Sequence, residues 1–304
     1  MSKSTYKAHL ALLGANVIYG VNHIVAKGVM PTKIGPSAFV FLRILGAAIL
    51  FWILKSFIKE KVDKKDFPLL ILCGLLGVAS NQLFFFHGLS RTSPIDASII
   101  ITAVPVMVLI FSTFLLKEKI TTNKFLGILV GGIGAILLIW YGEKSIGTSS
   151  VLGNVFVLIN ASTYALYLVL VKPLMKKYNP ITIISWAFLF GFLFMFPFGI
   201  KDILTTGFSV FTTETYLTVA YVVLGTTFLA YLFNIYALSK VSPSISGSYI
   251  YLQPVVSFIM VAVYAFILGY DEYAQDINFI KILSCLMVVA GVYLISKKPK
   301  VKLA

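Results

Sequence analysis

Polar side chains recur at helical spacing inside the most apolar parts of this sequence. Asn16, Tyr19 and His23 stand at i, i+3 and i+7, which places them on one face of a helix. Amide, phenol and imidazole groups can hydrogen-bond a small polar solute, and an unpaired polar group in hydrocarbon is costly. The spacing favours a helix face that lines a cavity and binds such a solute. It also suits a hydrogen-bonded seam between two helices, in which Gly20 would allow close packing.

Four further apolar stretches carry polar or aromatic faces of the same kind. Asn81 and Gln82 are consecutive, and consecutive residues point to different faces of a helix. We expect Asn81 to point inward, because Phe85 lies one turn later on the same face. The same argument applied to every stretch predicts one shared binding cavity. The residues predicted to bind the solute are Asn16, Tyr19, His23, Asn81, Phe85, Asn160, Tyr164, Tyr167, Thr227, Tyr231, Asn234, Tyr249 and Gln253.

Two prolines, Pro105 and Pro254, also lie inside apolar stretches. Each removes a backbone donor and leaves the carbonyl one turn earlier without its helical partner. Such a site can act as a hinge and can expose a backbone acceptor to a ligand. We therefore predict a gating role for both prolines, with a static bend that fits neighbouring helices as the alternative.

Groups that could perform catalysis or bind a metal are scarce. Asp96 is placed at a helix end rather than deep in an apolar stretch, and Cys73 and Cys285 lack a spacing to His that is typical of a metal site. We therefore predict no enzyme, no cofactor and no carboxylate ion relay. Arg43 is the one arginine inside an apolar stretch, and we expect it to reach the outer interface as a structural anchor. Attraction of an anionic substrate is the alternative for Arg43.

Membrane-spanning helices must position these side chains. The chain of 304 residues is 59% apolar and 12% charged, with a mean hydropathy of +0.95, whereas about a quarter of the residues of a soluble domain are charged. A helix needs roughly 20 mostly apolar residues to cross a bilayer. We predict an all-α polytopic membrane protein with ten transmembrane helices, at about 8–27, 36–55, 67–88, 95–116, 123–141, 151–171, 181–200, 215–237, 246–268 and 278–296.

The sequence contains an internal repeat. Residues 89–94 (LSRTSP) recur as 238–243 (LSKVSP), an offset of 149 positions, and each copy is followed eleven positions later by Pro105 or Pro254. We infer two five-helix repeats, residues 1–146 and 147–304. Because five is odd, the second repeat enters the membrane upside down. Inverted repeats around a central cavity are typical of transporters that work by alternating access.

Lysine and arginine are unequally divided between the two ends of the predicted spans. With the N-terminus inside, eighteen lie in inner segments and six in outer segments. This bias predicts that both termini are cytoplasmic and that the protein is a multi-pass protein of the inner membrane. The net charge of +14 is then explained by lysines that set the membrane topology and contact lipid headgroups, and it does not indicate nucleic-acid binding.

Several short motifs, at these spacings, resemble the EamA-type branch of the drug/metabolite transporter superfamily. They are Tyr19-Gly20, Phe41-Leu42-Arg43, Gly88-Leu89, Pro94, Pro105, Lys117-Glu118-Lys119-Ile120, Ala237-Leu238, Pro243, Gln253-Pro254 and Asp271-Glu272. The resemblance implies a basket-like fold that moves small metabolites, often amino acids. It also implies a cavity lined by the first, third, fourth, sixth, eighth and ninth spans. Tyr19 stands where many members of this family carry Trp, and this sequence also has Asn22 and His23 in the first span. The identity of the substrate therefore cannot be inferred from the resemblance.

We therefore expect a transporter that exports amino acids or related small solutes by alternating access, as a monomer or homodimer in the lipid bilayer. The main alternative is a carrier of nucleotide sugars or of lipid-type solutes that bear phosphate. Such a carrier needs several basic side chains at its cavity, and Lys27, Lys172 and Arg43 are the near candidates. A channel would give conductance rather than saturable exchange.

Overall fold

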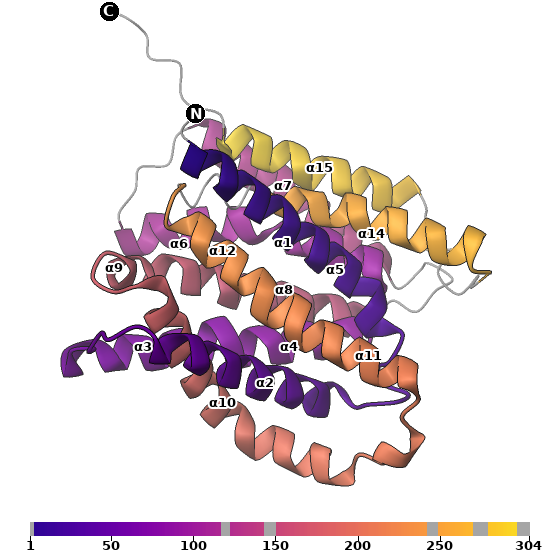
Figure 1. The fold of residues 1–304 in the computed structure, drawn as a ribbon. Coiled ribbons are helices and arrows are strands. Elements are labelled where there is room, and N and C mark those ends of the chain that lie inside the picture. The colour runs from indigo at the N-terminus through magenta and orange to yellow at the C-terminus, as the bar shows by residue number, and fades with distance from the viewer. Residues whose placement is uncertain (1–2, 117–121, 143–149, 242–248, 270–278, 297–304) are drawn as a thin grey trace, which may run out of the picture.

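The computed structural model describes residues 3–116, 122–142, 150–241, 249–269 and 279–296. These residues form a bundle of helices that run roughly side by side, with no β-strand among them (Figure 1). The turn at Glu118, Pro243 and the turn at Asp271-Glu272 lie outside the described residues. The predicted all-α membrane fold is confirmed.

The first half contains eight helical segments. They are α1 (Lys3–Lys27), α2 (Pro36–Ser56), α3 (Phe67–Gly74), the π-helix η2 (Leu75–Ser80), α4 (Asn81–Leu89), α5 (Pro94–Ile101), α6 (Val104–Leu116) and α7 (Thr122–Gly142). A short 3-10 turn, η1 (Lys64–Asp66), precedes α3.

The second half repeats the pattern. Its described segments are α8 (Val151–Leu170), α9 (Lys172–Met175), α10 (Pro180–Thr205), α11 (Thr213–Tyr221), the π-helix η4 (Val222–Leu229), α12 (Ala230–Leu238), the 3-10 helix η5 (Tyr249–Tyr251), α14 (Leu252–Ala262), the π-helix η6 (Val263–Ile267) and α15 (Phe279–Ser296). A 3-10 turn, η3 (Phe208–Val210), precedes α11.

Eight helical stretches within the described residues are long and apolar enough to cross a membrane. They are Tyr6–Lys27, Pro36–Ser56, Lys64–Leu89, Pro94–Leu115, Val151–Leu170, Pro180–Thr205, Thr213–Leu238 and Tyr249–Ile267. Helices α7 and α15 contain shorter apolar stretches, Phe125–Gly134 and Phe279–Gly291. The expected total of ten spans therefore stays a prediction.

Helix starts follow from local sequence. Pro36 and Pro180 each occupy the first turn, where a missing N–H costs nothing because no helical acceptor precedes it. The side chain of Ser93 caps α5 by accepting a hydrogen bond from the Asp96 amide at 3.1 Å. Ser150 caps α8 in the same way, and its hydroxyl accepts from the Gly153 amide at 3.1 Å. These caps fix where the spans begin.

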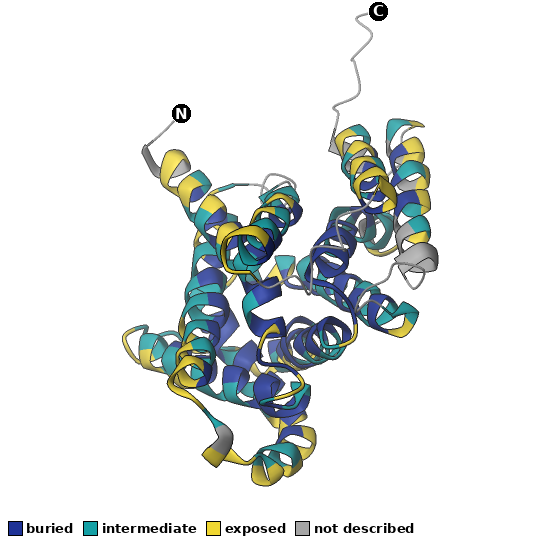
Figure 2. Cartoon of the chain, turned by 90° about the vertical axis from the view of Figure 1, so that its right-hand side faces the viewer, coloured by how far each residue is buried: buried dark blue, intermediate teal, exposed yellow. Residues whose placement is uncertain are grey.

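The two halves interlock by exchanging corresponding helices. Helix α1 packs against α12 and α14 of the second half, while α8 packs against α4 and α6 of the first. Helix α2 lies against α10, and α7 lies against α15 (Figure 1). Viewed along the bundle, buried residues face inward and exposed residues face the periphery (Figure 2). This reciprocal pairing is what two inverted repeats require.

The α7–α15 contact is made through glycines. A Cβ on Gly134 would lie 3.0 Å from the Ser284 carbonyl oxygen, and one on Gly291 would lie 2.6 Å from the Gly127 carbonyl oxygen. Small residues at such positions let helix backbones approach closely within a membrane. Gly134 and Gly291, which occupy the last helix of each half, therefore serve the same packing role.

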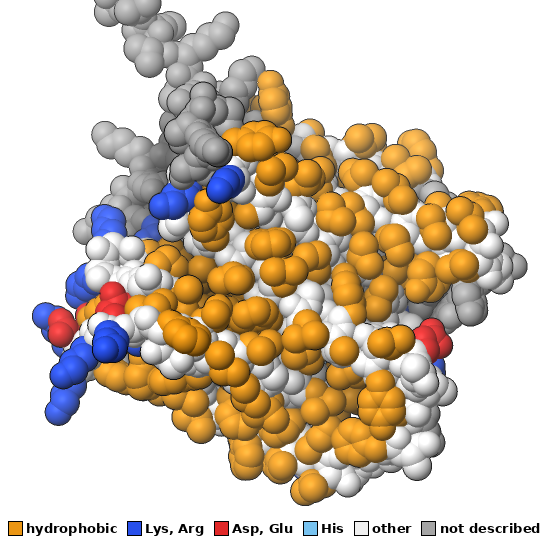
Figure 3. All heavy atoms as spheres, in the orientation of Figure 1, with side chains coloured by type: hydrophobic (Ala, Val, Ile, Leu, Met, Phe, Trp, Pro, Cys, Tyr) orange, Lys and Arg blue, Asp and Glu red, His pale blue; other side chains and the backbone are white. Residues whose placement is uncertain are grey.

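The surface of the bundle matches a membrane environment. Apolar side chains cover the middle of the face shown in Figure 3, whereas lysines gather at the end where α2 meets α3. Among the exposed residues of that connection are Lys59, Lys61, Lys64 and Lys65. An apolar belt with charge at its ends is the pattern that a lipid bilayer imposes.

Candidate functional site

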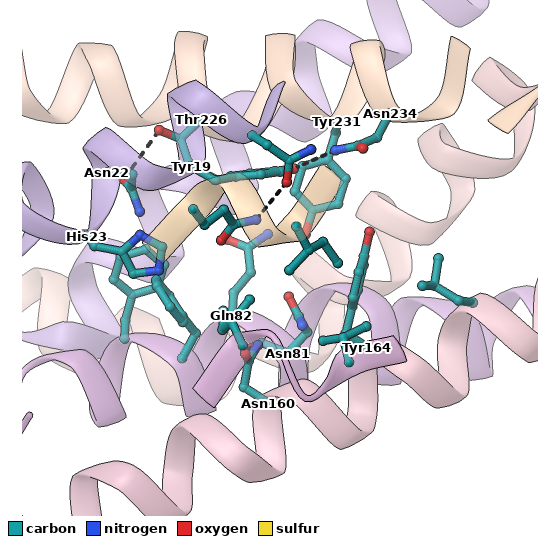
Figure 4. Close-up of a pocket in the computed structure, with 18 of the residues that line it drawn as sticks. Tyr19, Asn22, His23, Asn81, Gln82, Asn160, Tyr164, Thr226, Tyr231 and Asn234 are labelled. Atoms are coloured by element: carbon teal, nitrogen blue, oxygen red, sulfur yellow. Dashed lines mark hydrogen bonds between the residues drawn. The ribbon is translucent and has the colours of Figure 1, made fainter. Parts of the chain in front are cut away.

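A cavity of about 110 Å³ lies between the two halves (Figure 4). Its wall is built from α1, α2, α4, α5 and α6 of the first half and α8, η4, α12, η5 and α14 of the second. These include all six spans that the resemblance implies, together with α2. The space suffices for several water molecules or for a small solute.

Ten of the thirteen residues predicted to bind the solute lie in this wall. The remaining three, Tyr167, Thr227 and Tyr249, lie outside it. The ten are Asn16, Tyr19, His23, Asn81, Phe85, Asn160, Tyr164, Tyr231, Asn234 and Gln253.

The α1 face both lines the cavity and joins it to the second half. The Gln253 side-chain amide donates to Asn16 Oδ1 at 2.9 Å, and the Asn234 amide donates to the Tyr19 hydroxyl at 3.3 Å. A Cβ on Gly20 would lie 2.6 Å from Val256 Cβ, so α1 and α14 are in close contact. This face of α1 therefore both lines the cavity and forms hydrogen-bonded packing contacts with helices of the second half.

The three predicted residues outside the wall have structural contacts of their own. The Tyr167 ring packs on Gly77, where a Cβ would lie 2.5 Å from it. The Tyr249 hydroxyl hydrogen-bonds His9 Nδ1 at 2.7 Å, near the start of α1. Thr227 is part of η4, and its hydroxyl donates to the Val222 carbonyl at 2.7 Å. That carbonyl is five residues earlier, as in a π-helix.

Arg43 lies in the cavity wall rather than at the outer interface, which corrects the expectation that it extends out of the membrane. Its side chain is 3% exposed. Nε donates to the Thr227 hydroxyl at 2.9 Å, and the guanidinium carbon lies 4.1 Å above the centre of the Phe86 ring. Hydropathy cannot report this position, because it does not say which way an α2 residue faces. Thr227 therefore orients a cavity residue.

Two polar side chains of the wall have no hydrogen-bond partner within the described part of the chain. Neither ring nitrogen of His23 has one, and its ring meets Phe85 edge-on at 5.5 Å between centroids. Gln82 also lacks a partner for both its amide oxygen and its nitrogen. Gln82 was not expected at the cavity because Asn81 precedes it, yet both line it (Figure 4). The wall uses a broad face of α4, so neighbouring residues share it.

Sequence reasoning missed several further polar residues of the wall. Asn22 accepts a hydrogen bond from the Thr226 hydroxyl at 3.3 Å, which joins α1 to η4. The signal available in the sequence was adjacency, since Asn22 precedes His23 and Gln82 follows Asn81. No group of His, Cys, Asp and Glu that could hold a metal ion occurs in the described residues.

The predicted gating prolines follow irregular turns of helix, a division of the fourth span before Pro105 and a 3-10 turn that runs directly into α14 before Pro254. The fourth span is divided after Ile101, and Pro105 is the second residue of α6. In the ninth span, Pro254 follows η5 and is the third residue of α14. Proline is tolerated there because first-turn amides have no helical acceptor. The residues four positions before these prolines are Ile101 and Ile250, and both line the cavity.

A buried ion pair lies away from the cavity. Lys281 Nζ is 3.0 Å from Asp96 Oδ1, and the two residues are 1% and 0% exposed. Asp96 lies in the first turn of α5, at a helix end as predicted, and both it and Lys281 are buried within the protein. The pair joins α5 to α15. Lys27 and Lys172, the other basic candidates, lie outside the cavity wall, and Lys27 Nζ donates to the Ser90 carbonyl at 3.0 Å.

Comparison with known proteins agrees with this architecture. A relative described as an uncharacterized transporter from Archaeoglobus fulgidus is 28% identical over 267 residues, covering 87% of this chain and 90% of the relative. The uncharacterized transporter YetK of Bacillus subtilis is 27% identical, covering 98% and 89%. A solved crystal structure at 16% identity covers 96% of this chain and 95% of its own, with a TM-score of 0.63, and shows the same fold.

The EamA-like transporter family matches this sequence twice, over residues 6–140 and over residues 151–297. Both matches fall on helices that contribute to the same cavity. Polytopic helices, two family repeats and relatives described as transporters agree with one another. The chain is a membrane transporter and belongs to the EamA-like transporter family.

Proposed function

We propose that this protein exports amino acids or related small solutes through the cavity described above. The observation that carries the proposal is a cavity with polar side chains in its wall, which comes from corresponding helices of both halves. Asn16, Asn81, Asn160 and Asn234 supply neutral hydrogen-bonding groups, and Tyr19 and Tyr231 supply aromatic surface. Such a wall suits a small solute that carries both polar and apolar groups.

Alternating access of the two halves is the mechanism that we propose. Each half has an irregular turn of helix just before its proline, a division after Ile101 in the first half and the 3-10 helix η5 in the second, and the residue four positions before each proline lines the cavity. Discontinuous helices beside a central site are common in transporters built from inverted repeats. Pro105 and Pro254 would then allow the segments around the solute to move while the rest of each half stays rigid.

The orientation in the membrane is part of the same proposal. The lysine-rich end of the bundle, between α2 and α3, would face the cytoplasm, because positively charged connections are retained inside. Both termini would then be cytoplasmic and the protein would lie in the inner membrane. Export would proceed from this lysine-rich end to the opposite end.

The cavity gives less support to carriers of phosphate-bearing solutes. Arg43 is the one basic residue, apart from His23, in the described wall, while Lys27 and Lys172 lie outside it. A dianionic phosphate is normally bound by several charged donors. The charge of the wall therefore favours a less highly charged solute.

Counterflow in proteoliposomes tests the proposal. The full-length protein would exchange internal and external radiolabelled amino acids with saturable kinetics, and Asn16→Ala would weaken exchange about tenfold by removing the acceptor of Gln253. Ser162→Ala, also on a cavity helix but outside the wall, serves as the control. Exchange of a nucleotide sugar without exchange of any amino acid would overturn the proposal.

A further inference from the structure

One part of the cavity wall holds three side chains with polar atoms that the protein leaves without a partner. Within the described residues, Arg43 Nη1, both side-chain polar atoms of Gln82 and both ring nitrogens of His23 lack a hydrogen-bond partner. All three side chains are at least 97% buried, and all three line the cavity. Buried polar groups are nearly always satisfied in native proteins, so three in one wall require an explanation.

Two phenylalanines of α4 lie between Arg43 and His23. The Arg43 guanidinium lies over the Phe86 ring, Phe86 meets Phe85 edge-on at 4.8 Å, and Phe85 meets His23 at 5.5 Å. Gln82 lies one turn before these two phenylalanines on α4, and Figure 4 shows it extending into the cavity. The Phe85–Phe86 pair thus supports the two nitrogen-bearing side chains on neighbouring rings.

We propose that Arg43 binds one carboxylate group of the transported solute, and that Gln82 and His23 are further polar contacts for the solute in the same cavity wall. This inference rests on the proposed transport function and names the class of solute. Arg43 Nη1 would donate to a carboxylate oxygen, while Gln82 Nε2 and the N–H of His23, which neutral imidazole has in either tautomer, would donate to other polar atoms of the solute. Thr227 holds the opposite side of the guanidinium through Nε and so orients Nη1.

The charge of the wall selects a carboxylate over other groups. The described wall contains Arg43 and no Asp or Glu, so an anion would neutralise an otherwise uncompensated buried charge. An amine would meet no carboxylate there. A phosphate dianion would retain excess negative charge beside a single guanidinium.

The opposite part of the wall explains why the rest of the solute need not be charged. Asn16 and Gln253 bond each other, as do Tyr19 and Asn234, so these side chains present a neutral and largely satisfied surface. Charge recognition is therefore confined to the Arg43 region. Within the proposed range of solutes, the structure assigns specificity to the carboxylate rather than to the amino group.

Matched ligand pairs test this assignment on the purified full-length protein. The probes are lactate, benzoate and phenylalanine, each compared with its amide, and binding is followed by the shift in melting temperature. The carboxylates should stabilise the protein and their amides should not. N-acetylphenylalanine should compete as phenylalanine does, because its carboxylate is intact.

Variants connect the effect to the proposed residues. Arg43→Gln should weaken carboxylate binding about tenfold or more, as expected for loss of a charged hydrogen bond. Arg91→Gln makes the same change at an exposed arginine outside the cavity and should bind as the wild type does. Gln82→Leu keeps the size of the side chain and should weaken binding without changing the preference for a charged ligand.

Three results distinguish this inference from the proposed function. Equal stabilisation by carboxylates and amides, or none by any carboxylate, would overturn the carboxylate site. Transport of amino-acid amides as fast as amino acids would also overturn it while leaving the transport proposal in place. Carboxylate binding that depends on Arg43, without exchange of any amino acid, would support the site and overturn the proposed function.

Discussion

Arg43 and Lys281 are both buried cations, yet their surroundings differ. Lys281 forms a 3.0 Å ion pair with Asp96 between α5 and α15. Arg43 has no carboxylate within ion-pair distance among the described residues, and it relies on a hydroxyl and an aromatic face. The first cation is neutralised by the protein itself, whereas the second is held in position but not neutralised.

The difference indicates two kinds of role. Breaking a buried ion pair is strongly destabilising, because it leaves a charge without compensation. A buried charge that the fold has not neutralised contributes little or negatively to stability, and its retention is explained by a function. We therefore interpret the Asp96–Lys281 pair as a structural ion pair that joins two helices, and Arg43 as a residue that contacts the ligand. The following variants test that contrast.

Asp96→Asn should have the largest effect. The change keeps the shape of the side chain and removes the negative charge opposite Lys281, so we expect the free energy of unfolding to fall by about 3–5 kcal/mol. Denaturation in detergent, followed by circular dichroism, measures the loss. Adding Lys281→Met to an Asp96→Leu variant should restore most of the stability, since an apolar pair can replace a buried ion pair. If Asp96→Asn unfolded at the same denaturation midpoint as the wild type, the interpretation of the pair as a structural ion pair would be contradicted.

Arg43→Met should give the opposite pattern. Transport should fall by about tenfold or more, because a charged hydrogen bond to the solute is lost. Stability should change by no more than about 1 kcal/mol, because the loss of the Phe86 contact is offset by removal of an uncompensated charge. Counterflow and melting temperature on the same preparation measure both quantities. A variant that unfolds as easily as Asp96→Asn would show that Arg43 is structural.

Thr227→Val sharpens the role assigned to Arg43. Valine has the shape of threonine but cannot accept from Nε, so the guanidinium keeps its charge and loses its orientation. Loss of one neutral-acceptor hydrogen bond corresponds to about threefold to tenfold weaker carboxylate binding. Thr113→Val on α6, whose hydroxyl bonds only the Leu109 carbonyl, is the matched control. If the two variants weakened carboxylate binding equally, Thr227 would have no specific role in orienting Arg43.

Lys177→Met should have the smallest effect. Lys177 pairs with Asp66 at 3.0 Å, but its side chain is 48% exposed, and exposed pairs contribute little. The hydrogen bond that Lys177 donates to the Asp66 carboxylate raises the pKa of Lys177. Any stability it supplies is fully present below the ordinary lysine pKa and is lost only as pH rises through the raised value. Melting temperature should therefore be unchanged across the neutral range, in the variant as in the wild type. A pH-dependent difference near neutrality would contradict this.

The sequence specified the fold better than it specified the side-chain directions. Apolar length located the spans, and the predicted starts at 36 and 181 lie within one residue of the observed starts of α2 and α10 at Pro36 and Pro180. The cavity face of α1 also followed from helical spacing. Gln82 was misplaced because it was assumed not to share a helix face with Asn81, whereas both line the cavity. Arg43 was misplaced for another reason. Lipid-facing and cavity-facing sides are both apolar here, so hydropathy cannot decide which side a residue occupies.

Tyr249 and Tyr167 show a second limit. Both match the spacing of a cavity face, but His9 and Gly77 offer them closer partners. Those partners belong to distant parts of the sequence, 240 residues away for His9 and Tyr249. Local periodicity contains no information on such contacts. Only the packing of the two halves determines them.

Two of the three described π-helices, η2 and η4, also bear on the history of the chain. A π-turn is an α-helix that accommodates one additional residue. Shifted by the repeat offset of 149, η2 falls at 224–229, inside η4 at Val222–Leu229. A single insertion in an ancestral half-length gene, followed by duplication, accounts for both turns in one event.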